Sequence, residues 1–205
     1  MAVPDLGPWQ PLAVRDLAPL LAGMAFPWWV AGGWAIDLFV GHQTRLHDDL
    51  DVLVLRRDQL AVHQALRGWD LHAADPPGTL RPWAPGETLG ASIHDIWCRP
   101  AAAAPWAVQL MLADVDATGT RWVFRRDSRV TGSLSSLGRR SAEGITYVAP
   151  EVQLLYKAKQ APLPKDEEDF AVALPLLDAP SRRWLTQALI TLQPEHPWLE
   201  RLVLE

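Results

Sequence analysis

The sequence is poor in features that would each point to a particular class of protein. It has a single cysteine, Cys98, which excludes an internal disulfide framework and a cysteine zinc cluster and fits a reducing compartment. No run approaches the roughly 20 apolar residues of a membrane-spanning helix. The first residues lack the basic and apolar regions of a secretory signal, so we expect a soluble cytoplasmic protein that has no membrane partner.

Positive charge is also in short supply. Lys and Arg number 19 against 24 Asp and Glu, which gives a formal net charge of −5. Proteins that follow nucleic-acid phosphates over many contacts carry a basic excess, so nucleic acid is disfavoured as a partner. Neither a P-loop nor a G-x-S-x-G pattern occurs, and the histidines show no zinc-ligand spacing.

What the sequence does contain is the pattern of a globular α+β protein. Its 205 residues are 49% hydrophobic, enough for a sizeable core. Hydrophobic patterning and turn residues predict strands at 27–32, 50–55, 69–74, 93–98, 106–115, 120–127 and 145–148. Helices are predicted at 16–24, 32–41, 58–68, 150–159, 165–177 and 181–193. This order predicts a mixed β-sheet with flanking helices, residues 1–148, followed by a helical C-terminal part, residues 149–205.

Local signals refine these bounds. Asp16, Asp58 and Ser181 are predicted to cap the N-termini of their helices, and Pro19 to lie in the first turn of the first helix. Gly41 is predicted to end its helix, and Pro150 to occupy the first helical position. Segments 76–90 and 128–144 are predicted to be loops because Pro, Gly and Ser punctuate them.

Two motifs near residues 30–56 carry the chemistry. Gly32 and Gly33 open a short amphipathic helix, a turn that lets a polyphosphate meet backbone N–H groups. Asp49 and Asp51 enter a buried strand two residues apart, so their side chains face one way. Carboxylates this close resist burial unless their pKa shifts or they hold a divalent cation such as Mg²⁺. Each motif alone favours a plain turn or a solvated loop, whereas the two together favour a nucleotide site.

These residues resemble a known signature. The stretch GGWAIDLFVGHQTRLHDDLDV is similar to that of the DNA polymerase β-like nucleotidyltransferase superfamily, a GG or GS turn followed by an Asp-hydrophobic-Asp strand. More narrowly, it resembles the aminoglycoside 2''-O-adenylyltransferase-like branch. The later stretches TYVAPEVQLLYKAK and PKDEEDF also resemble bacterial members, and the similarity covers residues 15–178.

The resemblance implies a nucleotidyltransferase-type sheet domain over residues 1–148. It also implies a Mg²⁺-dependent enzyme that moves AMP from ATP, or NMP from another NTP, onto a hydroxyl of a small molecule. By position, Asp49 and Asp51 match the metal-binding catalytic pair, and Gly32 and Gly33 the phosphate turn. The candidates for the phosphate chain are Arg45, Lys157, Lys159 and Lys165.

One position departs from the family pattern. Gln109 stands where family enzymes place a third carboxylate, and an amide is no base. Asp114 lies an odd number of residues away and should face the opposite side. If Cys98 pairs with Trp106 across the hairpin, Asp95 lies opposite Gln109, and we hypothesise that Asp95 supplies the missing acid. Asp95 as an ordinary hairpin residue is the alternative.

Several alternatives stay open at this stage. A negative chain suits a cationic acceptor such as an aminoglycoside, but the charge is too modest to identify it. Gln109 also fits a catalytically weak or inactive nucleotide-binding or regulatory protein of the same fold. A nucleotidyltransferase of the toxin or antitoxin type fits the motif too. The sequence does not determine the oligomeric state or the preferred NTP.

Overall fold

The computed structural model describes residues 6–21 and 24–204. Its strands are β1 Trp28–Val30, β2 Asp51–Leu55, β3 Asp70–Ala74, β4 Leu80–Pro82, β5 Asp95–Arg99, β6 Val108–Val115, β7 Arg121–Val123, β8 Thr131–Ser133, β9 Gly138–Arg140 and β10 Thr146–Val148. Its α-helices are α1 Val14–Leu20, α2 Gly32–Val40, α3 Gln59–Ala65, α4 Pro150–Lys157, α5 Pro164–Ala173, α6 Ala179–Leu192 and α7 Trp198–Leu204. Short 3₁₀ turns cover Arg56–Asp58, Leu134–Ser136 and Leu174–Leu176.

The sheet is mixed, as the sequence predicts. Its strand order is β4-β3-β5-β6-β2-β1-β10-β9, and β7 joins β6 to β8. Strand β2 lies in the middle, parallel to β6 and antiparallel to β1. Its residues Val52–Leu55 are all buried, which explains why the strand is apolar on both faces. Asp51 is its first residue and pairs with Gln109 of β6, so the aspartate stands where the chain enters the sheet.

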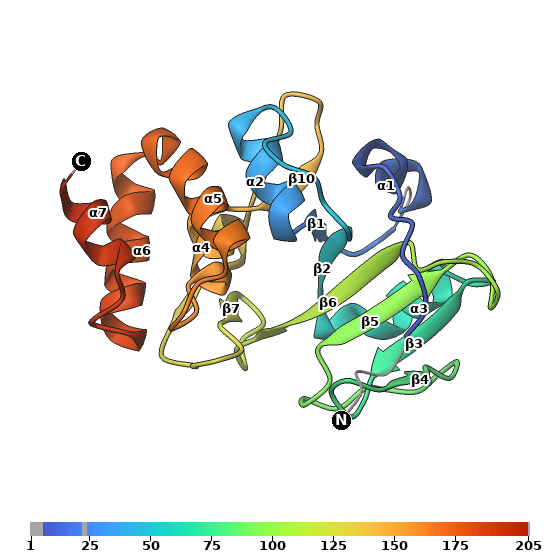
Figure 1. Ribbon diagram of the computed structural model, residues 1–205. Coiled ribbons are helices and arrows are strands. Elements are labelled where there is room, and N and C mark those ends of the chain that lie inside the picture. Colours follow the sequence, from blue (N-terminus) through green and yellow to red (C-terminus); the bar gives the residue numbers. More distant parts are fainter. Residues whose placement is uncertain (1–5, 22–23, 205) are drawn as a thin grey trace.

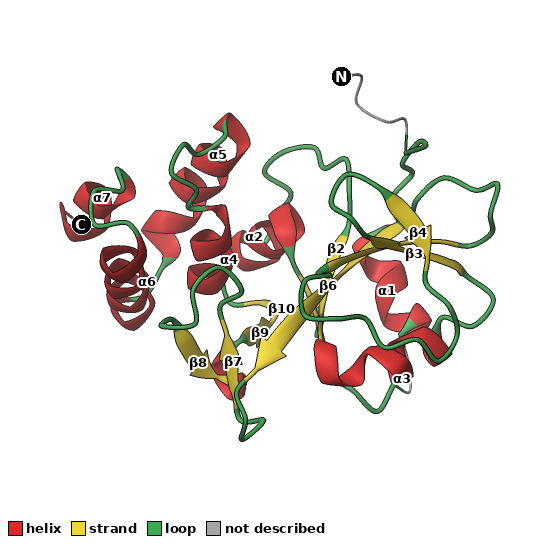
Figure 2. Ribbon diagram, turned by 90° about the horizontal axis from the view of Figure 1, so that it is seen from below, coloured by secondary structure: helices red, strands yellow, loops and turns green. Residues whose placement is uncertain are grey.

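The helices divide between the two parts of the molecule (Figures 1 and 2). Helix α2 follows β1 directly and ends at Gly41, whose φ of 92° is the left-handed conformation that glycine adopts easily. Helices α4 and α5 both contact α2, α6 contacts α4, and α7 contacts α6. Figure 1 shows α6 and α7 on one side, β3 to β6 on the other, and α2, α4 and α5 between them. The fold confirms the predicted α+β class.

Three predicted helix starts are wrong in detail. Helix α1 begins at Val14, so Asp16 lies in its first turn and Pro19 falls beyond that turn. Asp58 ends a 3₁₀ turn and occupies the predicted N-cap position of α3, but its side chain makes no cap hydrogen bond, and the helix ends early, at Ala65. Helix α6 is capped by Asp178, whose side chain accepts a hydrogen bond from the Ser181 N–H at 2.8 Å. A proline-containing first turn lets the helix begin two residues earlier than the serine suggests.

Several short elements were missed. Strand β4 lies within the predicted loop 76–90, and β8 and β9 lie within the predicted loop 128–144. Helix α7 was not predicted either. Three-residue strands are too short to show alternation in the sequence, and their neighbours in the sheet define them. In the described part of the chain, no helix is both long enough and apolar enough to cross a membrane.

The predicted register of the β5–β6 hairpin is offset by two residues. Asp95 pairs with Met111, and Trp97 pairs with Gln109. Trp106 does not pair with Cys98 because it bridges to Trp9 of the N-terminal segment, where the Gln10 N–H donates to its carbonyl at 2.9 Å. An offset of two keeps a side chain on its face, so Asp95 and Gln109 still share one face of the sheet.

Candidate functional site

Gly32 brings the β1–α2 turn against the Asp51 carboxylate. Its φ is +65°, and a Cβ there would overlap Asp51 Oδ2. Its N–H donates to Gln153 Oε1 of α4 at 3.0 Å, and the Ala31 N–H donates to the Asp51 carbonyl at 2.8 Å. Any other residue would strain the backbone and displace the carboxylate. The first glycine therefore fixes the position of Asp51.

Gly33 serves a different neighbour. A Cβ at this position would overlap Arg45 Nη2 and the ring of His47. The His47 side chain is buried, its Nε2 is hydrogen-bonded to Asp37 of α2, and its ring lies tilted against Trp34 with ring centroids 4.5 Å apart. The second glycine thus makes room for the loop of residues 41–50, which leads from α2 into β2.

Asp51 is the chemically unusual group of this region. Its Oδ1 is buried and has no hydrogen-bond partner among the described residues. Burial raises the pKa of Asp51 to about 7, and the charges of Asp49 and Asp95 act in the same direction. Lys157 and Lys165 oppose this shift only in part. A buried carboxylate without a hydrogen-bond partner is unstable as an anion. Binding of a proton or a cation would therefore stabilise Asp51.

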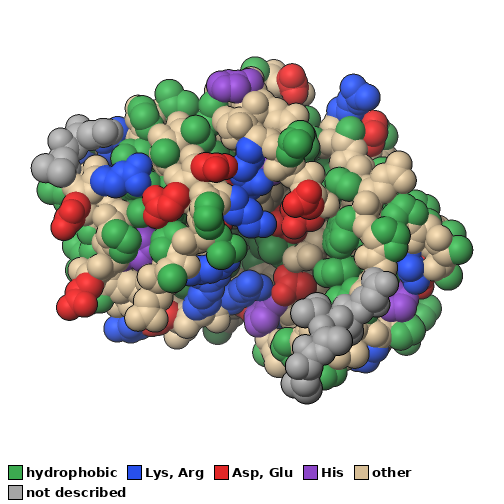
Figure 3. All heavy atoms as spheres, in the orientation of Figure 1, with side chains coloured by type: hydrophobic (Ala, Val, Ile, Leu, Met, Phe, Trp, Pro, Cys, Tyr) green, Lys and Arg blue, Asp and Glu red, His purple; other side chains and the backbone are tan. Residues whose placement is uncertain are grey.

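A pocket of about 220 Å³ opens beside Asp51. Its cationic lining residues are Arg125, Arg126, Lys157, Lys159 and Lys165. The polar residues Gly32, Gln153, Tyr156 and Asp166 complete its polar wall. On the face drawn in Figure 3, basic and acidic side chains gather near the middle of the molecule, between the helical part and the sheet.

The distribution of lysines along the chain supports this pocket as the candidate site. The sequence has only three lysines, Lys157, Lys159 and Lys165, and all three line it, whereas 16 arginines are spread over the chain. This bias was a signal in the sequence that the motif analysis missed. Gln153 and Tyr156 were missed as well, because nothing in a helix pattern distinguishes them from core residues.

Two aspartates of α5 hold the pocket lysines. Lys157 Nζ lies 2.6 Å from Asp169 Oδ2 and 3.4 Å from Asp166 Oδ1. Lys159 Nζ lies 3.5 Å from Asp166 Oδ2. Both aspartates are buried, Asp166 at 2% and Asp169 at 0% exposed.

Arg45 is paired with a buried aspartate and does not line the pocket. Its Nε and Nη2 donate to the two oxygens of Asp169 at 2.8 and 2.9 Å. Burial alone would raise the pKa of Asp169, but the hydrogen bonds from Arg45 and the charge of Lys157 lower it. Arg45 is thus bound as a bidentate partner of a buried carboxylate, and the pocket lining does not include it.

Asp95 stands next to the site without lining the pocket. Gln109 Nε2 donates to Asp95 Oδ1 at 3.3 Å, and Arg125 Nη1 lies 3.7 Å from the same oxygen. Gln109 in turn pairs with Asp51 in the sheet. The structure therefore brings Asp95 into the electrostatic neighbourhood of Asp51, together with Asp49.

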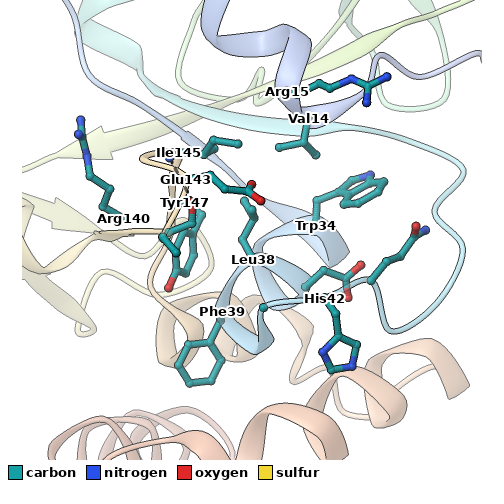
Figure 4. A pocket seen from close by; sticks show the side chains of 15 residues that line it. Val14, Arg15, Trp34, Leu38, Phe39, His42, Arg140, Glu143, Ile145 and Tyr147 are labelled. Atoms are coloured by element: carbon teal, nitrogen blue, oxygen red, sulfur yellow. Dashed lines mark hydrogen bonds between the residues drawn. The ribbon is translucent and has the colours of Figure 1, made fainter.

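A larger pocket of about 440 Å³ lies along α2 (Figure 4). Trp34, Leu38 and Phe39 of α2 and Ile145 and Tyr147 of the β10 region contribute its apolar lining. None of the residues predicted for the nucleotide site lines it. Size alone would favour this pocket, but the carboxylate and the lysines identify the smaller one as the candidate site.

The donor set suits a hard divalent cation. In the described residues no three His, Cys, Asp or Glu side chains are arranged as a complete metal site. Mg²⁺ does not require one, because it keeps several waters and is held by one or two carboxylates with substrate phosphates. The unpartnered oxygen of Asp51 with Asp49 nearby fits that mode of binding.

The comparisons with known proteins agree with the resemblance to nucleotidyltransferases. Residues 13–75, which hold both motifs, match the model of the aminoglycoside-2''-adenylyltransferase family. That match covers about a third of the chain and confirms the resemblance seen in the sequence. No curated protein matches the chain.

Three solved structures show the same fold. The lincosamide antibiotic adenylyltransferase LnuA, bound to lincomycin, has a TM-score of 0.53 at 16% identity, over 78% of this chain and 92% of that one. The antibiotic-resistance factor ANT(2'')-Ia in solution has a TM-score of 0.54 at 16% identity, over 92% and 93%. ANT(2'')-Ia with adenylyl-2''-tobramycin has a TM-score of 0.53 at 17% identity, over 85% and 95%.

Proposed function

We propose that the protein transfers AMP from ATP to a hydroxyl group of a small molecule, with Mg²⁺ held by Asp49 and Asp51. One observation carries the proposal: the buried, unpartnered oxygen of Asp51 stands beside a pocket that gathers every lysine of the chain. A carboxylate for a cation beside several ammonium groups is the arrangement that a metal-bound triphosphate needs.

Each part of the chain has a separate task in this proposal. The sheet domain, residues 1–148, supplies Asp49, Asp51 and Asp95, and the helical subdomain, residues 149–205, supplies the lysines. Lys159 and Lys165, with Arg125 and Arg126, neutralise the phosphate oxygens as charge develops on the leaving pyrophosphate. When bound, Mg²⁺ supplies Lewis-acid polarisation of the phosphate and lowers the pKa of the attacking hydroxyl.

Asp95 replaces the missing third carboxylate. It shares a face with Gln109 and acts on Asp51 electrostatically. Asp95 accepts the proton of the acceptor hydroxyl, while the Gln109 amide orients it through Oδ1. The match to a family of antibiotic-modifying enzymes supports a hydroxyl-bearing antibiotic such as an aminoglycoside or a lincosamide as acceptor.

The lysine distribution permits a sharp test of nucleotide binding. Periodate-oxidised ATP reacts with amines, and after reduction it leaves a mass tag. The chain offers only Lys157, Lys159, Lys165 and its N-terminal amine. We expect Mg²⁺-dependent labelling of the pocket lysines that excess ATP prevents and that Asp51→Ala abolishes. Labelling confined to the N-terminal amine, or unaffected by ATP, would refute the proposed site.

Transfer is tested with a panel of acceptors. The protein is incubated with Mg²⁺, ATP and single aminoglycosides, lincosamides or other polyols, and pyrophosphate release is measured. We expect release that depends on one acceptor class and is lost in Asp49→Ala.

A second candidate function rests on Gln109. An amide at the third carboxylate position, with Arg125 close to Asp95, also suits a protein that binds nucleotide without turning it over. ATP binding that depends on Asp51, with no pyrophosphate release for any acceptor, would favour this alternative.

A further inference from the structure

Asp169 joins the two parts of the site. It lies on α5 and is fully buried, yet it contacts neither the pocket nor the acidic pair directly. Its carboxylate binds Arg45, from the loop that leads to Asp49 and Asp51, and Lys157, from the last turn of α4. Figure 1 shows α2, α4 and α5 next to one another at this point.

The charges in this cluster balance. Arg45 and Lys157 contribute two positive charges, and Asp166 and Asp169 contribute two negative ones. Burial of ionised groups is tolerated when they are paired and hydrogen-bonded in this way. Lys157 and Arg45 are 9% and 17% exposed in their side chains, so neither can leave Asp169 for a ligand without exposing a buried charge. Lys159 is 46% exposed and is free of that constraint.

We propose that Asp169 is a positioning residue that fixes the metal-binding loop and the pocket-lining residue Lys157 relative to each other. Arg45 then acts as the anchor of the loop and makes no phosphate contact. Lys157 contributes positive charge at the pocket wall, and this charge opposes the rise in the pKa of Asp51. This inference rests on the proposed function for its effect on nucleotide binding, while its structural part stands without it.

The route from Asp169 to the acidic pair runs through Arg45. Arg45 passes over Gly33, at the start of α2, where no side chain obstructs it. The loop then continues through His47, which Asp37 of α2 holds by a hydrogen bond to Nε2. With Arg45 released, the loop keeps the Asp37 contacts at its middle but loses its link to α5. Asp49 lies two residues after His47 on this loop, so the same release would loosen the position of one carboxylate of the acidic pair.

The test compares Asp169→Asn with Glu168→Gln, which removes the same charge from the adjacent, exposed position of α5. Binding of Mg²⁺ with α,β-methylene ATP is measured by calorimetry, and hydrogen exchange is followed in residues 42–50. We expect Asp169→Asn to raise the dissociation constant at least tenfold and to speed exchange in the loop at least tenfold. Glu168→Gln should change neither.

Calorimetry separates positioning from mere stability. A residue that only stabilises the fold would lower the number of binding-competent molecules and leave the dissociation constant of the folded ones unchanged. Arg45→Gln provides a second variant that leaves the contact between Lys157 and Asp169 intact. We expect it to reproduce the faster loop exchange, and Arg45→Gln with Asp169→Asn to be no worse than Asp169→Asn alone.

The possible failures are distinguishable. An unchanged dissociation constant together with unchanged loop exchange in Asp169→Asn overturns the inference. If the unaltered protein does not bind the nucleotide at all, the proposed function fails. Loop exchange in Arg45→Gln and Asp169→Asn then still decides whether Asp169 anchors the loop.

Discussion

Gln109 donates a hydrogen bond from Nε2 to Asp95 Oδ1 at 3.3 Å, across the β5–β6 hairpin. The two residues are diagonal neighbours, since Asp95 pairs with Met111 and Gln109 with Trp97. An amide in the position of a family carboxylate is thus joined to a carboxylate on the next strand. In the proposed mechanism, the acidic function has moved by one strand while staying on the same face of the sheet.

This relationship predicts the effect of exchanging the two groups. Asp95→Asn should lower kcat by roughly 10²-fold or more, the range of a general base, without a comparable change in the KM for ATP. Asp95→Asn combined with Gln109→Asp should recover part of the rate, because a carboxylate returns to the same face. The measurement is acceptor-dependent pyrophosphate release. A full rate in Asp95→Asn would show that Asp95 is not the base.

Gly33→Ala should destabilise the protein by about 1–3 kcal/mol, the usual cost of overpacking, because its Cβ overlaps Arg45 and His47. Gly90→Ala is the matched control, since a Cβ there meets no atom within 4 Å. Urea unfolding followed by circular dichroism gives both values. Equal stability of the two variants would mean that the loop of residues 41–50 yields to the methyl group.

The pKa of Asp51 predicts how stability depends on pH without divalent cations. In the folded protein burial raises the pKa of Asp51 to about 7, whereas the usual pKa of an aspartate in an unfolded chain is 3.8. Between these values the folded state binds more protons, so the free energy of unfolding should fall as the pH rises, by at most about 4 kcal/mol. Urea unfolding at several pH values should show this slope reduced in Asp51→Asn. An identical slope in that variant would contradict the assignment.

Replacement of Lys157 and replacement of Lys159 should have different effects on stability. Lys157→Met leaves Asp166 and Asp169 with one cation fewer in a buried place, so it should cost about 3–5 kcal/mol of stability. Lys159→Met removes a half-exposed partner and should change stability by under about 0.5 kcal/mol while weakening ATP binding. Thermal unfolding and calorimetry on both variants test this. Equal loss of stability in the two would show that exposure does not distinguish them.

Much of the local structure follows from sequence patterns because they act over a few residues. The strand β2 was predicted from an apolar run, α2 from its opening glycines and the C-cap Gly41, and α4 from Pro150 at its first position. The short strands β4, β8 and β9 were not predicted, since hydrogen bonds to the adjacent strand, and not a pattern within their own three residues, define them.

By itself, the sequence determined the type of fold and the chemistry of the entrance to β2: two glycines, a short helix and an acidic pair read in one direction along the chain. Only the tertiary structure decided what those residues touch. It placed Gly32 against Asp51, turned Arg45 to Asp169 and set Asp95 diagonal to Gln109. These contacts join residues up to 124 positions apart, and no local pattern encodes them, because they depend on how buried charges find partners when separate elements pack together.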